Sequence, residues 1–257
     1  MDKNIGFNRN LYRPWLDAAA AFCSETDDLV EVRACLEPVV EQDIKSAVNR
    51  RKAIDTLINI CGKSADIAPG LHREALTRFQ TTPTIADRLW LHYGMTLLTY
   101  PFFREVSATI GQLGRHEETI SPAMVKQRMI AERGELGSLE KAVERVMFSM
   151  RNWGLLAPSS QRYAYTPRVQ ALSTNQISLE LWLLACALNA HPADELPFAD
   201  LLHLPELFPF RFAVKVDDAR QHPSLAVQRQ GAGWDIVQVV PQKTQVPMAP
   251  GEGNQAN

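Results

Sequence analysis

The chain has 257 residues, of which 46% are hydrophobic and 22% charged, a composition typical of a folded protein with a sizeable core. This composition excludes a disordered, collagen-like or disulfide-scaffold protein. The 27 basic and 29 acidic residues leave a net charge of −2, so any nucleic-acid-binding surface must be a local patch.

No apolar stretch reaches the roughly twenty residues that a membrane-spanning helix needs, and the N-terminus lacks the pattern of a secretory signal. We therefore expect a cytoplasmic protein without a membrane partner. The cysteines at positions 23, 35, 61 and 186 show neither a Cys-x-x-Cys spacing nor a close Cys/His pairing that would favour zinc. We expect them to be reduced, mostly buried thiols.

Residues 1–100 show a helical periodicity of apolar residues and are expected to form an N-terminal helical bundle. Proline, glycine and short polar segments separate the predicted helices, and Gly62 stands where a cap would end the third of them. The fifth helix is apolar on nearly every side, which predicts a place at the centre of the bundle. The predicted helices span residues 14–23, 29–40, 43–61, 69–79 and 83–99.

Residues 101–170 follow the order of elements of a winged helix-turn-helix. Ser121 and Ser138 are predicted N-terminal caps, and Gly154 is predicted to end the last helix. Positive charge is concentrated here, because residues 121–168 contain eight basic and four acidic residues in a chain whose net charge is −2. The predicted helices span 101–113, 123–133 and 139–152, and a hairpin follows with strands at 155–157 and 162–166.

The helix over 139–152 has a polar face opposite its apolar stripe. In a major groove, its Arg and Lys side chains would reach guanine edges, while Ser and Asn would contact bases or phosphates. Other basic residues would follow the DNA backbone. Against this interpretation, Glu140 and Glu144 on the same helix would repel phosphates, and a polar helix face is often only solvated. The predicted nucleic-acid-binding residues are Arg50, Arg51, Lys52, Lys126, Ser138, Lys141, Arg145, Ser149, Asn152, Arg162 and Arg168.

Residues 171–240 are expected to form a smaller α+β unit, either a second, degenerate winged helix or a simple cap. Helices are predicted over 179–188, 197–203 and 205–208, and a hairpin is predicted to join 225–228 to 234–240. Residues 241–257 are rich in Pro, Gln, Gly and Asn without periodic apolar residues, which predicts a disordered tail.

The sequence contains no catalytic or cofactor motif that we recognise. The six histidines are scattered, and there is no HExxH, GxSxG, P-loop or GxGxxG pattern. We therefore expect no enzymatic activity, no metal, no cofactor and no small-molecule substrate.

The order of these elements resembles the BrxA family of bacterial BREX phage-defence systems over about residues 10–170. The resemblance rests on a basic helix at 43–61 containing Asn49-Arg50-Arg51-Lys52, and on an aromatic-rich helix pair at 87–99 and 101–113. It rests further on the segment LEKAVERVMFSMRNWGLL at 139–156. The resemblance implies a small, non-enzymatic, double-stranded-DNA-binding component of a defence operon that also encodes a methyltransferase and an ATPase.

The main hypothesis is therefore an accessory protein that binds double-stranded DNA and positions other subunits of a defence complex. One alternative is a winged-helix adaptor that docks partner proteins. Its motivation is the near-neutral charge and an apolar segment expected to be exposed, with Pro197, Phe198, Leu201, Leu202, Leu204, Leu207, Phe208 and Phe210. A second alternative is a sequence-specific transcriptional regulator, although such proteins usually dimerise and no clear dimerisation helix is recognised.

Overall fold

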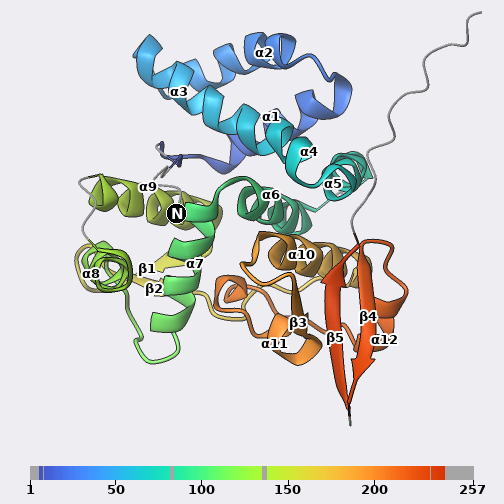
Figure 1. Ribbon diagram of the computed structural model, residues 1–257. Coiled ribbons are helices and arrows are strands. Elements are labelled where there is room, and N and C mark those ends of the chain that lie inside the picture. Colours follow the sequence, from blue (N-terminus) through green and yellow to red (C-terminus); the bar gives the residue numbers. More distant parts are fainter. Residues whose placement is uncertain (1–5, 8, 82–83, 135–137, 232, 241–257) are drawn as a thin grey trace, which may run out of the picture.

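The computed structural model describes residues 6–7, 9–81, 84–134, 138–231 and 233–240. The protein is mainly helical with two small antiparallel sheets, as the sequence predicts. Figure 1 shows the helices of the first hundred residues above, with the two sheet-containing regions side by side below them. The predicted disordered tail, residues 241–257, lies outside the described residues.

The N-terminal region begins with a segment that precedes the first helix and then forms a bundle. The predicted third helix starts later than expected, at Ala47, and it does not end at Gly62. Gly62 instead lies within a π-helical turn, where a Cβ atom would be only 3.0 Å from Leu29, so this glycine permits close helix packing. The elements are α1 (Arg13–Glu25), α2 (Leu29–Glu41), α3 (Ala47–Ile58), η1 (Asn59–Lys63), α4 (Ser64–Ile67), α5 (Pro69–Thr81) and α6 (Ile85–Thr99).

The middle region contains three helices and a short hairpin close to their predicted positions. Strands β1 and β2 pair antiparallel, with Ala157 opposite Thr166. Ile120, between the first two helices, pairs with Tyr165 in both directions, at N–O distances of 2.8 and 2.9 Å. The extended residue Ile120 is therefore hydrogen-bonded to β2, the last strand of this region. The elements are α7 (Pro101–Leu113), α8 (Pro122–Arg133), α9 (Leu139–Trp153), β1 (Leu156–Pro158) and β2 (Tyr165–Pro167).

The C-terminal region repeats this order of helix, strand, helices and hairpin. Its sheet has the strand order β3-β5-β4, so again the first strand pairs with the last. Strand β3 and helix α12 were not predicted from the sequence, because segments this short carry little periodic signal. The elements are α10 (Ile177–Ala190), β3 (Glu195–Pro197), α11 (Phe198–Leu202), η2 (Pro205–Leu207), α12 (Val216–Arg220), β4 (Leu225–Gln230) and β5 (Trp234–Val239).

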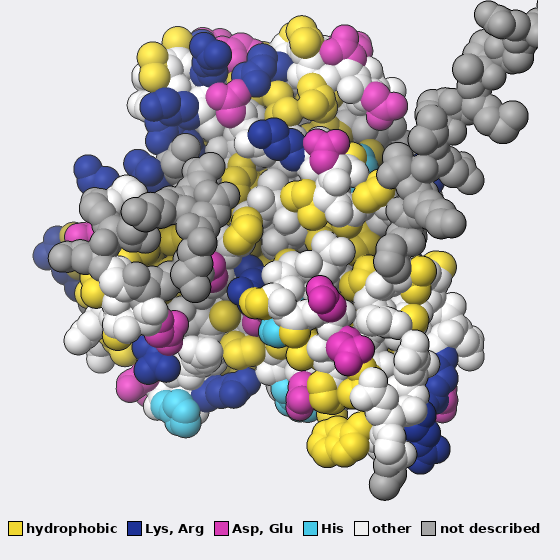
Figure 2. All heavy atoms as spheres, viewed as in Figure 1, with side chains coloured by type: hydrophobic (Ala, Val, Ile, Leu, Met, Phe, Trp, Pro, Cys, Tyr) yellow, Lys and Arg dark blue, Asp and Glu magenta, His cyan; other side chains and the backbone are white. Residues whose placement is uncertain are grey.

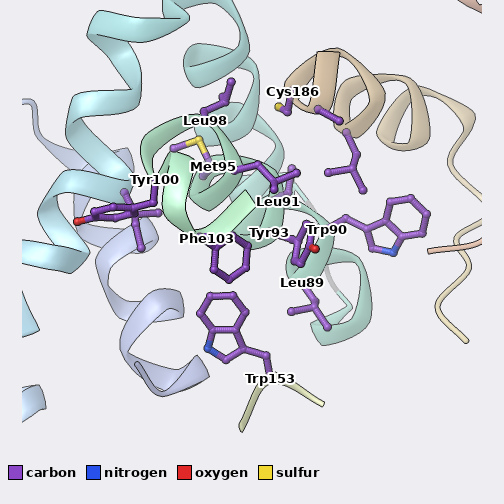
Figure 3. Packing of buried hydrophobic residues seen from close by; sticks show 14 of the residues in the cluster. Leu89, Trp90, Leu91, Tyr93, Met95, Leu98, Tyr100, Phe103, Trp153 and Cys186 are labelled. Carbon is purple, nitrogen blue, oxygen red and sulfur yellow. The ribbon is translucent and has the colours of Figure 1, made fainter. Parts of the chain in front are cut away.

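Helix α6 lies at the centre of one continuous hydrophobic core, as its apolar sequence predicts. Its Tyr93 ring packs 5.3 Å from Phe103 of α7, and Phe103 in turn lies 5.6 Å from Trp153 at the end of α9 (Figure 3). On α6, Gly94 leaves room for Trp182 of α10, because a Cβ atom there would lie 2.5 Å from the indole ring. The core thus joins all three regions.

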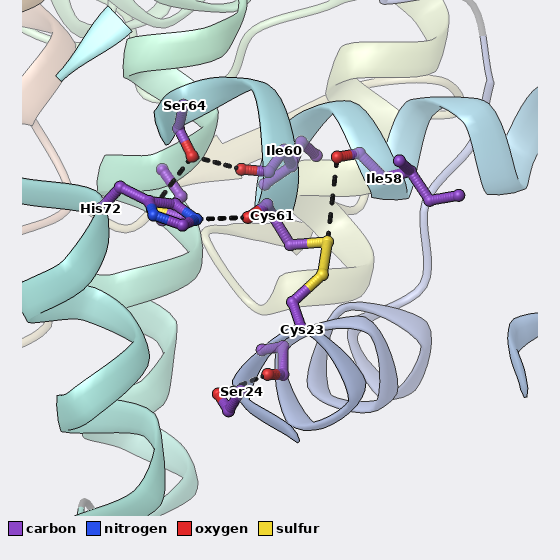
Figure 4. Close-up of a disulfide and its surroundings, with 9 residues drawn as sticks. Cys23, Ser24, Ile58, Ile60, Cys61, Ser64 and His72 are labelled. Atoms are coloured by element: carbon purple, nitrogen blue, oxygen red, sulfur yellow. Dashed lines mark hydrogen bonds between the residues drawn. A yellow bond between two sulfur atoms is a disulfide. The ribbon is translucent and has the colours of Figure 1, made fainter. Parts of the chain in front are cut away.

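A disulfide between Cys23 and Cys61 links α1 to η1, with the two Cα atoms 6.3 Å apart (Figure 4). The expectation of reduced thiols is therefore wrong for this pair. The two residues are 38 positions apart in the sequence, and only the packing of α1 against η1 brings their buried side chains together. Cys35 and Cys186 are free, and Cys186 is buried.

None of the helices in the described ranges combines the length and apolar character that crossing a membrane requires.

Candidate nucleic-acid interface

Helix α9 has a strongly amphipathic sequence. Its apolar stripe, which includes Val143, Val146 and Met150, is fully buried, and Gly154 ends the helix in the left-handed conformation with φ 86°. Ser138 occupies the N-cap position, but its side chain makes no capping hydrogen bond, so the predicted capping role is not observed. Ser138 is exposed at this end of the helix.

Two residues predicted to face DNA instead hold the N-terminal segment against α9. The Ser149 side chain is completely buried, and its Oγ accepts a hydrogen bond from the backbone N–H of Leu11 at 3.0 Å. The Asn152 Oδ1 accepts one from the N–H of Arg13 at 2.9 Å, and Trp153 Nε1 donates to the Leu11 carbonyl at 3.1 Å. The prediction that Ser149 contacts DNA is therefore wrong, because no ligand can reach its side chain. The Asn152 amide oxygen is already hydrogen-bonded to the Arg13 backbone.

The N-terminal segment brings Arg9 next to Arg145 of α9. Both arginines line a cleft of about 300 Å³, together with Asn49 near the start of α3, and Arg9 Nη2 donates a hydrogen bond to Asn49 Oδ1 at 3.2 Å. Partial burial, and then the nearby charge of Arg145, lower the pKa of Arg9 from its usual value. The two guanidinium groups therefore repel each other, an arrangement that an anion between them would relieve.

One acidic residue, Asp43, also lines this Arg9–Arg145 cleft. Its Oδ2 accepts a hydrogen bond from Trp15 Nε1 at 3.0 Å. The charged residues of the cleft therefore sum to one positive charge. Sequence reasoning missed Arg9, because it precedes the first helix and belongs to no periodic pattern.

The basic run at the start of α3 divides into two parts. Arg51 and Lys52 are exposed. Arg50 is largely buried: its guanidinium pairs with Glu37 and Glu41, and donates to the Ile44 carbonyl at 3.2 Å. Arg50 therefore fastens α3 to the end of α2, and its charge is compensated within the protein, which argues against the predicted role in DNA binding.

The remaining predicted residues lie on α8, α9 and the hairpin. Lys141 is exposed on α9. Lys126 of α8 is paired with Glu140 of α9, with Nζ and Oε2 2.5 Å apart, so its charge is also compensated. On the hairpin, Arg162 is exposed and its guanidinium lies 4.8 Å from the centre of the Tyr163 ring. Arg168 is exposed and donates to the Gly154 carbonyl at 3.3 Å.

Figure 2 shows Lys and Arg side chains along the edge of the molecule where α3 lies above α8 and α9, with acidic side chains among them. The shared lining of the Arg9–Arg145 cleft connects the start of α3 with α9, although the two are about 90 residues apart in the sequence. We define the basic surface by its exposed or cleft-lining cations, Arg9, Arg51, Lys52, Lys141 and Arg145.

The apolar segment that motivated an adaptor function is not exposed. Leu201, Leu207 and Phe210 are at most 2% exposed, and Leu204 and Phe208 are also buried. The Phe210 ring packs 4.5 Å from Trp90 of α6. The expectation of an exposed apolar surface at 196–212 is therefore wrong, because these residues complete the common core.

A His–Asp hydrogen bond between α6 and α1 serves the fold. His92 of α6 is 2% exposed, and its Nε2 lies 2.8 Å from Asp17 Oδ1 of α1. Burial lowers the pKa of His92, which favours the neutral imidazole. Among the described residues, no group of three or more His, Cys, Asp and Glu side chains is arranged to hold a metal ion.

Comparison of the chain with protein-family models, with curated proteins and with solved structures finds no match.

Proposed function

We propose that this protein binds double-stranded DNA as a non-enzymatic accessory component of a larger complex, mainly through contacts with phosphates. The observation that carries this proposal is the Arg9–Arg145 cleft. There the N-terminal segment and α9 bring Arg9 and Arg145 together beside Asn49 of α3, whose exposed Arg51 and Lys52 follow along the same helix. Lys and Arg side chains on one continuous surface supply the electrostatic attraction on which non-specific DNA binding depends.

The architecture supports a nucleic-acid-binding module. We propose that α7–β2 is a winged helix, because the order helix, extended residue, two helices and hairpin is combined with pairing of Ile120 to β2. The strand order β3-β5-β4 supports a second, reduced winged helix at residues 177–239, with the short α12 in the place of the long α9.

Phosphate contacts are favoured over base reading because of the charges on α9. Its exposed stripe includes Glu140 and Glu144, which would face the edges of bases if the helix entered a groove directly. Arg145 lies to one side of this stripe, in the cleft that it shares with Asn49 of α3, and Lys141 precedes it by four residues, one turn earlier on the helix. We therefore expect little sequence preference and no need for a dimer, which argues against a sequence-specific regulator.

The resemblance to the BrxA family would place this DNA binding in a bacterial phage-defence complex. That assignment remains a prediction, and the genes beside the coding sequence test it. A neighbouring methyltransferase and ATPase gene would support it, whereas an unrelated operon would oppose it.

Fluorescence anisotropy with two unrelated duplexes of equal length tests the DNA binding itself. With four or five phosphate contacts, we expect the affinity to fall about 100- to 500-fold between about 50 and 200 mM salt. The two duplexes should bind within a few-fold of each other. Affinity that does not depend on salt would refute the proposal.

Charge-reversal variants locate the surface. We expect the double variants Lys141→Glu/Arg145→Glu and Arg51→Glu/Lys52→Glu each to weaken binding at least about tenfold and to reduce the salt dependence. The control is Arg73→Glu/Arg229→Glu, which makes the same change in net charge on exposed residues of α5 and β4, away from α9 (Figure 1). Equal losses in all three variants would show that only net charge matters and that this surface is not the site.

A further inference from the structure

A second cleft, separate from the basic surface, lies between α8 and α9. Its volume is about 460 Å³, and its apolar lining comes from one face of α8, with Pro122, Ala123 and Ile130. The opposite wall is α9, and Tyr163 of the hairpin closes one side. None of its lining residues belongs to the Arg9–Arg145 cleft, so the two are distinct sites.

The charged groups at this α8–α9 cleft leave one carboxylate uncompensated. Lys126 and Glu140 pair across the two helices at 2.5 Å, so they neutralise each other. The hydrogen bond and charge of Lys126 lower the pKa of Glu140, which keeps that carboxyl ionised. Glu144 also lines the cleft and is exposed, and within the described part of the chain it has no cation within 4.0 Å. An apolar cleft with a negative rim is unsuited to phosphates.

Tyr163 lies in the turn between β1 and β2, where it projects beside this cleft. Its side chain is 68% exposed, and its backbone has φ 60°, a left-handed conformation that bulky residues rarely adopt. Arg162 stacks on the ring and donates to the Tyr163 hydroxyl at 3.0 Å, which fixes the ring orientation. The left-handed backbone belongs to the hairpin turn, which the Ala164 N–H closes on the Gln161 carbonyl at 3.2 Å, whereas an exposed aromatic ring held in one orientation is characteristic of binding sites.

We infer that the α8–α9 cleft binds a segment of a partner protein that carries an apolar side chain next to a lysine or arginine. The apolar side chain would bury itself against Pro122 and Ile130. The cation would pair with Glu144, and the Tyr163 ring, which already carries Arg162 on one face, would contact the apolar side chain. This surface would allow the protein to hold a partner while the basic surface contacts DNA.

The test begins with selection from a display library of random peptides on the full-length protein, with counter-selection against the bare support. We expect the enriched peptides to share a Lys or Arg beside an apolar residue. A synthetic consensus peptide should bind in anisotropy measurements, and its version with Glu in place of the basic residue should not. Enriched peptides without a basic residue would overturn the inference.

Matched variants then locate the peptide. Glu144→Lys should weaken binding of the consensus peptide about tenfold, and Tyr163→Ala several-fold, because both side chains are exposed and their loss leaves the core intact. Glu25→Lys, the same change at the exposed end of α1, should have no effect. Equal binding to wild type and Glu144→Lys would refute this site.

A duplex-DNA competition separates this inference from the proposed function. The peptide should not displace labelled DNA, and Glu144→Lys should not weaken DNA binding. If peptide and DNA compete, or if Tyr163→Ala weakens DNA binding but not peptide binding, the cleft belongs to the DNA surface and the inference fails.

Discussion

Replacing Ser149 by alanine tests whether this residue serves the fold or contacts DNA. The substitution removes a buried hydroxyl that accepts the Leu11 N–H and donates to the Arg145 carbonyl at 2.8 Å. Alanine is slightly smaller and apolar, so the main consequence is an unpaired buried N–H at Leu11, which is itself completely buried. Such a group costs about 1–3 kcal/mol.

Ser64→Ala is the matched control. Ser64 is equally buried, but its hydroxyl donates to the Ile60 carbonyl four residues earlier, at 2.9 Å, with Met95 Sδ as an alternative acceptor. Its loss therefore leaves no backbone N–H unpaired, and we expect a cost below about 1 kcal/mol. The difference between the two variants isolates the bond that fastens the N-terminal segment to α9.

Urea unfolding monitored by tryptophan fluorescence measures both variants, and DNA anisotropy is recorded under native conditions. We expect Ser149→Ala to lose more unfolding free energy than Ser64→Ala, and to lose little DNA affinity beyond what a looser Arg9 would cause. Equal stability losses would refute the role of Ser149 in docking the N-terminal segment. A folded, stable Ser149→Ala protein without DNA affinity would restore Ser149 as a DNA contact.

Three further predictions concern the core. Reduction of the Cys23–Cys61 disulfide, which closes a loop of 38 residues, should lower the unfolding free energy by about 4 kcal/mol. Thiol titration of the denatured, unreduced protein should count two thiols rather than four. Burial lowers the pKa of His92, so the unfolded chain takes up a proton at this residue more readily than the folded protein. The unfolding free energy should therefore fall as the pH drops below about 6.5, by at most about 1.4 kcal/mol per pH unit. Thermal melts of His92→Gln should show a smaller fall. Gly111→Ala should destabilise the protein by about 2–3 kcal/mol in urea titrations, because the new Cβ would collide with the Pro205 carbonyl where α7 meets η2. The control Gly114→Ala should cost far less, because its Cβ would be at least 3.2 Å from its neighbours.

The sequence predicts the helices of this protein well wherever a long apolar period exists. The apolar sequence of α6 indicates its central position, and Ser121 followed by Pro122 marks the start of α8, where the Ser121 Oγ accepts the N–H of Met124 at 3.3 Å. The helices over 101–113 and 139–152 are also found close to their predicted bounds. These features depend on local spacing and capping, which a single sequence carries directly.

The candidate site was predictable only in part. Lys141 and Arg51 are exposed as expected, but the polar face of α9 is shared between solvent and protein. A serine that will be buried by a distant segment has the same helical position as one that faces a ligand. Nothing in the period of α9 reveals that residues 11–13 will cover its last turns, since that contact joins positions about 140 residues apart.

The sequence alone thus determined the helical class, the place of most helices and the local concentration of positive charge, because these depend on the residue types along each segment. The tertiary structure decided which charges remain available. It pairs Arg50 with Glu37, and Lys126 with Glu140, brings Arg9 to Arg145, and joins Cys23 to Cys61. Charge compensation and burial are properties of neighbours in space, and those neighbours come from elements that only the packing around α6 brings together.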